Sequence, residues 1–106
     1  MESCVFCKIV KGETPTKFEK ETQNMVVFKD IQPQAPLHLL IVPRLHIKDA
    51  TEVTDEIWTE IKDVVLAIAR QRSLSGFRIV HNSGDAAAVP HMHVHLLGEV
   101  AAERSV

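Results

Sequence analysis

The chain has 106 residues and a mass of 11.9 kDa, which is the size of one domain, so we expect a single domain over residues 1–106. Hydrophobic residues make up 45% and charged residues 25% of the chain, a composition that excludes an intrinsically disordered protein. Twelve Lys and Arg residues against fourteen Asp and Glu residues give a formal net charge of -2. With no block of like charges, binding to nucleic acid or to an anionic membrane is not expected.

The amino terminus carries no pattern of a secretory signal, because Met1 to Cys4 has no basic stretch leading into an apolar run. No apolar segment reaches the roughly 18 residues that span a bilayer. We therefore expect a cytoplasmic protein. In a reducing compartment, the pair Cys4 and Cys7 indicates metal or redox chemistry rather than a structural disulfide.

In the first half of the chain, the pattern predicts a turn at Gly12 to Pro15 and a short strand over Lys17 to Lys20. A stronger strand is predicted over Met25 to Lys29. Asp30 to Pro36 contains two prolines, which lack backbone donors, and is predicted to be a loop. Leu37 to Val42 is predicted to be a buried strand.

The spacing of apolar residues then changes to that of a helix, which we predict over Asp55 to Arg72. Asp49 or Thr54 is a candidate cap for its start, and Gly76 is a candidate stop. The residues that form the apolar stripe are Ile57, Ile61, Val64, Val65, Ile68 and Ala69.

Two further strands are predicted after the helix, over Phe77 to His81 and Met92 to Leu97, with the polar stretch Asn82 to Pro90 between them. Strands interrupted by one long helix indicate an α+β fold, with an antiparallel sheet covered on one face.

Three histidines alternate with aliphatic residues near the carboxyl end: His91, His93 and His95. On a strand they point to one face while the aliphatic residues enter the core. They could simply be exposed. They do not converge on one metal ion from a straight strand, whose outer two Cα atoms lie roughly 13 Å apart. We expect a division of labour, in which the central histidine does chemistry, one end histidine orients it and the other goes elsewhere.

This run matches the histidine-triad pattern, His-x-His-x-His-x-x with x hydrophobic. Cys4 to Val10 resembles the amino-terminal signature of that family, Asp30 to Pro36 its central loop, and His38 to His46 its following strand and Pro-x-x-His turn. From Cys4 to about Gly98 the chain resembles the nucleotide-binding, Hint-like branch of the histidine-triad (HIT) family, in its bacterial zinc-containing type.

The resemblance implies an antiparallel sheet of about five strands with one long helix, paired as a homodimer. It implies binding of a purine nucleotide and hydrolysis of nucleoside phosphoramidates or related nucleotidyl conjugates. His93 would attack the α-phosphorus and carry a transient nucleotidyl group, with His95 and His38 as supporting imidazoles.

The resemblance also implies a nucleotide site. Apolar side chains would sandwich the base, the carboxylate of Asp30 would accept from the ribose hydroxyls, and Asn82 would contact phosphate or ribose. Judged without the family, these would be core and turn residues. The remaining members of the implied site are Phe6, Ile9, Phe28, Ile31 and Val89.

A structural zinc site is implied in the same way. By themselves, Cys4 and Cys7 are as consistent with two spare thiols as with a ligand pair. Relatives of the bacterial type add the histidine of the Pro-x-x-His turn and the first histidine of the triad, here His46 and His91. Two thiolates and two imidazoles form the closed tetrahedral set of a structural zinc.

The chain departs from the family before the triad, where Ala86-Ala87-Ala88 replaces glutamine and serine donors. The favoured function is a purine nucleotide hydrolase acting through His93. The alternative is a nucleotide-binding sensor or partner module in which catalysis is weak or lost. A third hypothesis is a metallohydrolase with a catalytic zinc on His91, His93 and His95. The sequence leaves the physiological substrate open.

Overall fold

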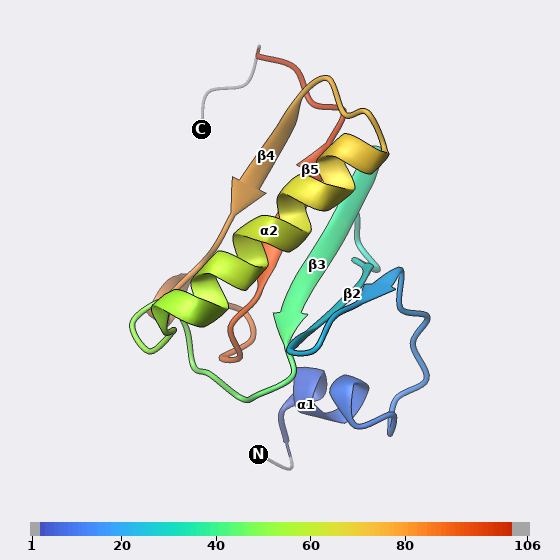
Figure 1. Cartoon of the computed structure of the whole chain (residues 1–106). Helices are drawn as coiled ribbons and strands as arrows, with labels where there is room; N and C mark the ends of the chain where they lie inside the picture. The colour runs from blue at the N-terminus through green and yellow to red at the C-terminus, as the bar shows by residue number, and fades with distance from the viewer. Residues whose placement is uncertain (1–2, 103–106) are drawn as a thin grey trace.

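The computed structural model describes residues 3–102 of the chain. Its elements, in chain order, are α1 (Val5–Val10), β1 (Lys20–Glu21), β2 (Met25–Lys29), β3 (Leu37–Pro43), α2 (Asp55–Gln71), β4 (Phe77–Val80), a 3-10 turn η1 (Gly84–Ala86) and β5 (Val94–Gly98). Figure 1 shows the long helix α2 lying across β3 and β5, with the short helix α1 near the end of β3.

The five strands form one antiparallel sheet in the order β1-β2-β3-β5-β4. The last strand of the chain therefore enters the middle of the sheet, between β3 and β4. There Leu40 pairs with His95 on one side, and Val80 pairs with His95 on the other. The α+β fold with an antiparallel sheet and one long helix, predicted from the sequence, is confirmed.

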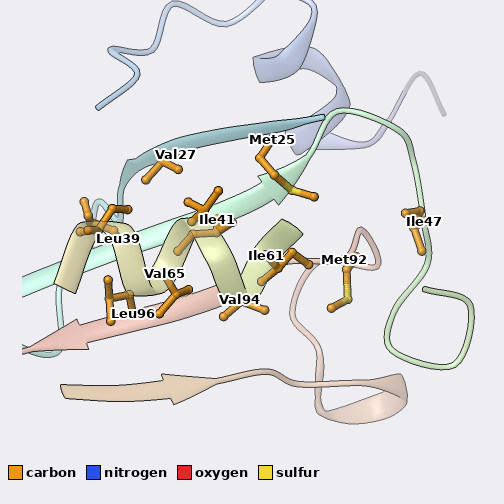
Figure 2. Packing of buried hydrophobic residues seen from close by; sticks show 12 residues of the cluster. Met25, Val27, Leu39, Ile41, Ile47, Ile61, Val65, Met92, Val94 and Leu96 are labelled. Atoms are coloured by element: carbon orange, nitrogen blue, oxygen red, sulfur yellow. The ribbon is translucent and has the colours of Figure 1, made fainter. Parts of the chain in front are cut away.

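The main core lies between α2 and one face of the sheet. Alternate residues of the central strands point to this face, including Leu39, Ile41, Val94 and Leu96, all 0% exposed. Figure 2 shows them meeting the helix residues Ile61 and Val65. The predicted aliphatic face of the triad segment is therefore core, and Met92 belongs to the same cluster.

A second cluster covers part of the opposite face of the sheet. Helix α1 contributes Phe6 and Ile9, which pack on side chains of β2 and β3. This helix was not predicted, because six residues are too few for helical periodicity to be visible. The sheet residues beneath it are Val26, Phe28, Leu40 and Val42.

The ends of α2 are formed by local hydrogen bonds. Thr54, and not Asp49, caps its start, since the Thr54 side chain accepts from the N–H of Ile57. At its end, Ser73 has a left-handed backbone (φ 52°), while the Leu74 N–H donates to the Ala69 carbonyl at 3.0 Å. This is a Schellman motif.

The prediction that Gly76 stops α2 is wrong, because Ser73 adopts the positive φ three residues earlier. The predicted strand at Lys17 to Lys20 is also misplaced, since β1 is only Lys20–Glu21. The strands at residues 25–29 and 37–42 are confirmed.

The last predicted strand begins later than expected, at Val94 rather than Met92. The Met92 N–H donates to the carbonyl of Ile47 at 2.6 Å. The backbone before Val94 thus bonds to the loop after β3 and not to the sheet ladder. His91 and His93 consequently lie on an irregular segment that leads into β5.

Candidate functional site

His93 is buried, with 5% of its surface exposed, at the point where the irregular segment enters β5. Its Nδ1 lies 2.7 Å from the carbonyl oxygen of His91. A carbonyl only accepts, so Nδ1 carries the proton and Nε2 keeps its lone pair. Burial lowers the pKa of His93, which favours this neutral form. A neutral imidazole with a free Nε2 is the form that can act as a nucleophile.

His95 and His38 form an ordered pair beside it. The N–H of Gln34 donates to Nδ1 of His38 at 3.0 Å, so the proton of a neutral His38 is on Nε2. That Nε2–H points to Nδ1 of His95, at 2.8 Å. His95 must therefore carry its own proton on Nε2. Burial, together with the nearby His93 and His38 imidazoles, lowers the pKa of His95.

The carboxylate of Asp30 lies at the same place. Its Oδ2 is 3.4 Å from Nε2 of His38 and 4.0 Å from Nδ1 of His95, and these three side chains could in principle hold a cation. The hydrogen bond from Gln34 opposes this, because a metal on Nε2 of His38 would need the proton on Nδ1, facing an N–H donor. The arrangement is that of a hydrogen-bonded pair of neutral imidazoles beside a carboxylate.

A cleft of about 590 Å³ opens in front of His93 and His95. This volume is in the range of small-molecule sites. Helix α1, the loop after β2 and the loop before His91 form its walls. All seven residues expected to bind nucleotide line it: Phe6, Ile9, Phe28, Asp30, Ile31, Asn82 and Val89.

The residues that form the walls differ in burial. Phe28 is 4% exposed and makes an edge-to-face contact with the ring of Phe6, whose centroid is 5.8 Å away. Phe6 also meets the ring of His93 edge-to-face at 5.0 Å. Ile31 is 95% exposed, so it lies on the rim. Asp30 is held by a turn in which its Oδ1 accepts from the N–H of Gln32.

The alanine segment is part of the same cleft. Ala86 and Ala88 line it beside Asn82, and they offer no side-chain donor. The cleft is also lined by Thr14, Pro15 and Thr16, which were not predicted from the sequence.

Four further side chains form a second cluster: Cys4, Cys7, His46 and His91. Their ligand atoms all lie within 4.8 Å of one another. Individual separations are 3.3 Å from Cys4 Sγ to His91 Nδ1, 3.2 Å from Cys7 Sγ to His46 Nδ1, and 3.1 Å between the two Nδ1 atoms. A tetrahedral zinc with these ligands has donor–donor edges of about 3.3–3.8 Å, from the usual Zn–S and Zn–N lengths.

The surroundings of the cluster fit a metal site. Nε2 of His91 lies 2.8 Å from the carbonyl of Pro43, so it carries the proton and leaves Nδ1 free toward the cysteines. Such an outer hydrogen bond is typical of metal-binding histidines. Cys4 is also the N-cap of α1, accepting from the N–H of Cys7 at 3.4 Å. Burial raises the pKa of Cys7, so a bound cation would displace its proton.

The third hypothesis from the sequence, one metal on His91, His93 and His95, is not supported by the placement of their donors. Among residues 3–102, potential ligand atoms gather in two groups, and neither contains His93. His91 faces the cysteines and His95 faces His38, which is the division of labour expected from a strand. The solvent-exposed alternative is also wrong for His91, which is 0% exposed.

One histidine was not assigned any role from the sequence. His81 follows β4, and its Nδ1 lies 2.8 Å from the carbonyl oxygen of His93. Its position next to Asn82 in the sequence could have indicated that it lies near the site. Its hydrogen-bond partner could not be predicted, because that partner is a backbone atom.

Across residues 3–102, the helices lack the combination of length and apolar character that a bilayer-spanning segment requires. Residues 3–105 match the family described as "Scavenger mRNA decapping enzyme C-term binding". The chain is 35% identical to the adenosine 5'-monophosphoramidase of Saccharomyces cerevisiae, over 90% of this chain and 61% of that protein. It is 38% identical to a 14 kDa zinc-binding protein of Zea mays, over 89% and 80% of the two chains.

Solved structures agree with these relatives. A HIT family hydrolase from Clostridium thermocellum superimposes with a TM-score of 0.90 and 36% identity, covering 100% of this chain and 98% of that one. A Zn-bound histidine triad family protein from Mycobacterium smegmatis gives 0.86 and 31%, covering 97% and 79%. With the alternating histidines, the fold and these matches in agreement, the chain belongs to the histidine-triad (HIT) family.

Proposed function

We propose that the chain is a purine nucleotide-binding hydrolase that cleaves nucleoside phosphoramidates or related nucleotidyl conjugates. The observation that carries the proposal is the orientation of His93, whose Nδ1 is occupied by the His91 carbonyl at 2.7 Å. Its Nε2 is thereby the free nitrogen, and the ring lines the cleft. The similarity to an adenosine 5'-monophosphoramidase supports this substrate class.

In the first step, Nε2 of His93 forms a bond to the α-phosphorus while the bond from phosphorus to the leaving nitrogen breaks. The bonding electrons go to that nitrogen, which takes one proton delivered from solvent through the Nε2–H of His95. The nucleotidyl group then sits on His93. In the second step water attacks phosphorus, the electron pair returns to Nε2, and the surplus proton of the water goes to solvent.

The nucleoside would occupy the apolar part of the cleft. Phe6 and Phe28 offer flat walls for a purine base, with Ile9 and Val89 beside them. Asp30 would accept from the ribose hydroxyls, and Asn82 would contact phosphate or ribose. Ile31 would close the rim.

The alternative function is a nucleotide-binding module with weak or lost turnover. Ala86 and Ala88 favour it, because they line the cleft without any donor for the phosphate. Stabilisation of the developing charge would then come from the Asn82 amide, the His95 Nε2–H and backbone N–H groups, with Lys29 also lining the cleft.

The deciding experiment is the hydrolysis of an AMP–amine conjugate by the purified protein and by His93→Ala. We expect turnover by the parent, a transient intact-protein mass increase equal to one adenylyl group, and neither from the variant. Both proteins should bind a nonhydrolysable AMP analogue. Binding by both without cleavage by the parent would establish the binding module instead.

We also propose that Cys4, Cys7, His46 and His91 hold a structural zinc ion. A bound ion would fix the start of α1 to the segment leading into β5, and its four protein ligands would leave no position for substrate. The relative named as zinc-binding and the Zn-bound neighbour support this assignment.

A homodimer is proposed as the functional form. β4 is an edge strand, and two large apolar side chains are half exposed, Ile79 on that strand and Trp58 on α2. Pairing would cover an open edge and apolar surface that a chain this small cannot bury alone. Sedimentation velocity should give twice the chain mass, and a monomer at micromolar concentration would reject the assignment.

A further inference from the structure

Five of the six histidines line the cleft, pair with a histidine that lines it, or belong to the cysteine cluster of Cys4, Cys7, His46 and His91. The sixth is His81. It lies directly after β4, and its Nδ1 is 2.8 Å from the carbonyl oxygen of His93. Since a carbonyl only accepts, this Nδ1 carries the proton and donates. The last residue pair between β4 and β5 is Val80 with His95. The His81 side chain therefore supplies a hydrogen bond to His93 at the point where the backbone ladder has ended.

The other ring nitrogen is also in use. With the proton on Nδ1, Nε2 is an acceptor, and it lies 2.6 Å from Oγ of Ser83 and 3.3 Å from the N–H of Ala50. The same Ala50 N–H is 3.2 Å from Oγ of Ser83. One tautomer of His81 satisfies every one of these contacts, so the ring joins the end of β4, the loop before α2 and the backbone of His93.

A second hydrogen bond, to the buried carboxylate of Asp49, holds the loop that follows His81. Asp49 is buried, and its Oδ2 accepts from the N–H of Gly84 at 3.0 Å. Its Oδ1 accepts from the N–H of Thr51 at 2.9 Å. The main chain is thus held on both sides of Asn82, whose side chain lines the cleft with His93.

We propose that His81 is a positioning residue of the reaction, which aims Nε2 of His93 by holding the His93 carbonyl. The inference rests on the proposed function, because it concerns the aim of the nucleophile. The His93 side chain is tied by its ring to the His91 carbonyl, and its main chain is tied by His81. Loss of the second tie lets the ring shift relative to phosphorus. Errors of about 1 Å in such geometry cost up to about a hundredfold in rate.

Two substitutions of His81 test the hydrogen bonds of Nδ1 and Nε2 one at a time. The amide nitrogen of an asparagine can occupy the place of Nδ1, so His81→Asn keeps a donor toward His93. The amide of a glutamine reaches the place of Nε2, so His81→Gln keeps the contact with Ser83 and loses the one with His93. Ser75→Ala, which removes a hydroxyl bonded to Glu99 beyond the far end of β4, is the control.

We expect His81→Gln to lower kcat for an AMP–amine conjugate by about tenfold or more, the scale of one lost hydrogen bond plus misalignment. KM and the Kd of a nonhydrolysable AMP analogue should stay within about twofold, because the nucleoside walls are untouched. His81→Asn should recover kcat to within about threefold of the parent, and Ser75→Ala should match the parent. Equal kcat values for the Gln and Asn variants and the parent would overturn the proposal.

Nitrogen-15 NMR of the histidine rings tests the same inference without turnover. The parent should show His81 protonated on Nδ1, and only His81→Gln should shift the ring signals of His93. A parent that cleaves no conjugate but shows this NMR behaviour refutes the proposed function alone. A His81 ring protonated on Nε2 in the parent, or His93 signals that move equally in both variants, refutes the positioning role.

Discussion

His38 donates from Nε2 to Nδ1 of His95 across 2.8 Å, and the direction of this bond is set by the Gln34 N–H that occupies the other nitrogen of His38. The Nε2–H of His95 is in consequence the donor that this ring can offer in the cleft. The backbone N–H of Gln34, the His38 ring and the His95 ring thus form one series of hydrogen bonds, which determines the ring nitrogen of His95 that carries the proton.

The first prediction concerns this bond. His38→Phe removes the donor to His95, and we expect kcat for an AMP–amine conjugate to fall by about tenfold or more, the effect of losing one hydrogen bond that fixes a tautomer. His38→Gln can place an amide N–H near the former Nε2 and should retain more activity. Steady-state kinetics of both variants measure the difference, and equal losses would mean that the bond does not set the His95 tautomer.

The second prediction concerns pH. Nδ1 of His95 can accept from His38 only while His95 is neutral, and burial lowers the pKa of His95 below its ordinary value of about 6.5. We expect kcat/KM to stay level as pH falls through 6.5 and to decline only under more acidic conditions, where His95 gains its proton. A decline that begins above about pH 6.5 would contradict the assignment.

The third prediction concerns Asp49, whose pKa is lowered to about 2, first by the Thr51 hydroxyl and then by the N–H groups of Thr51 and Gly84. In the unfolded chain a pKa of about 3.9 is expected. The carboxylate therefore stabilises the fold fully above about pH 4, and this contribution is lost as pH falls toward 2.

Asp49→Asn should accordingly unfold at lower urea concentration than the parent at neutral pH, because an amide N–H2 would face the N–H of Gly84. The gap between the two proteins should close at about pH 2. The exposed Asp63→Asn on α2 is the control and should not change the midpoint. A gap that is constant with pH would show that the charge of Asp49 plays no part.

The fourth prediction concerns metal. Protein purified under reducing conditions should contain one zinc per chain, and its removal with a chelator should lower the melting temperature. A ligand present at a thousand times its Kd adds about 4 kcal/mol to the free energy of unfolding. Cys7→Ser should reproduce the loss, and the chelator should then have no further effect. A metal-free parent with an unchanged melting temperature would refute a structural site.

Elements that depend on local sequence patterns were predicted better than elements that depend on contacts distant in the sequence. Helix α2 and strands β2 and β3 have a local pattern of apolar spacing, and all three were predicted closely. Helix α1 was missed, because it depends on packing against Val26 and Phe28 of the sheet rather than on a pattern of its own. The end of α2 was predicted to within one residue, but the stop signal was wrongly assigned to Gly76, since a serine, Ser73, takes the left-handed conformation that glycine usually supplies.

Some residues of the candidate site were predicted from the sequence and others were not, for the same reason. The family pattern pointed to residues whose side chains meet in one cleft and one cluster. It could not point to His81, because the partner of that ring is the main-chain carbonyl of His93. A bond to a backbone atom leaves no complementary residue type in the sequence. The antiparallel pairing of β4 with β5, which ends at Val80 and His95, brings the two together.

Phe6 contacts both the proposed metal site and the cleft, which would link the binding of metal to the binding of nucleotide. Its ring contacts two histidine rings edge-to-face, that of His91 in the cysteine cluster at 5.8 Å and that of His93 in the cleft at 5.0 Å. Phe6 lies on the short helix α1, which is capped by Cys4. If the proposed zinc ion orders this helix on binding, it would also order a wall for the proposed nucleoside. Thermodynamic reciprocity would then require that each ligand tighten the binding of the other by the same factor, so that a shortage of the metal would weaken nucleotide binding.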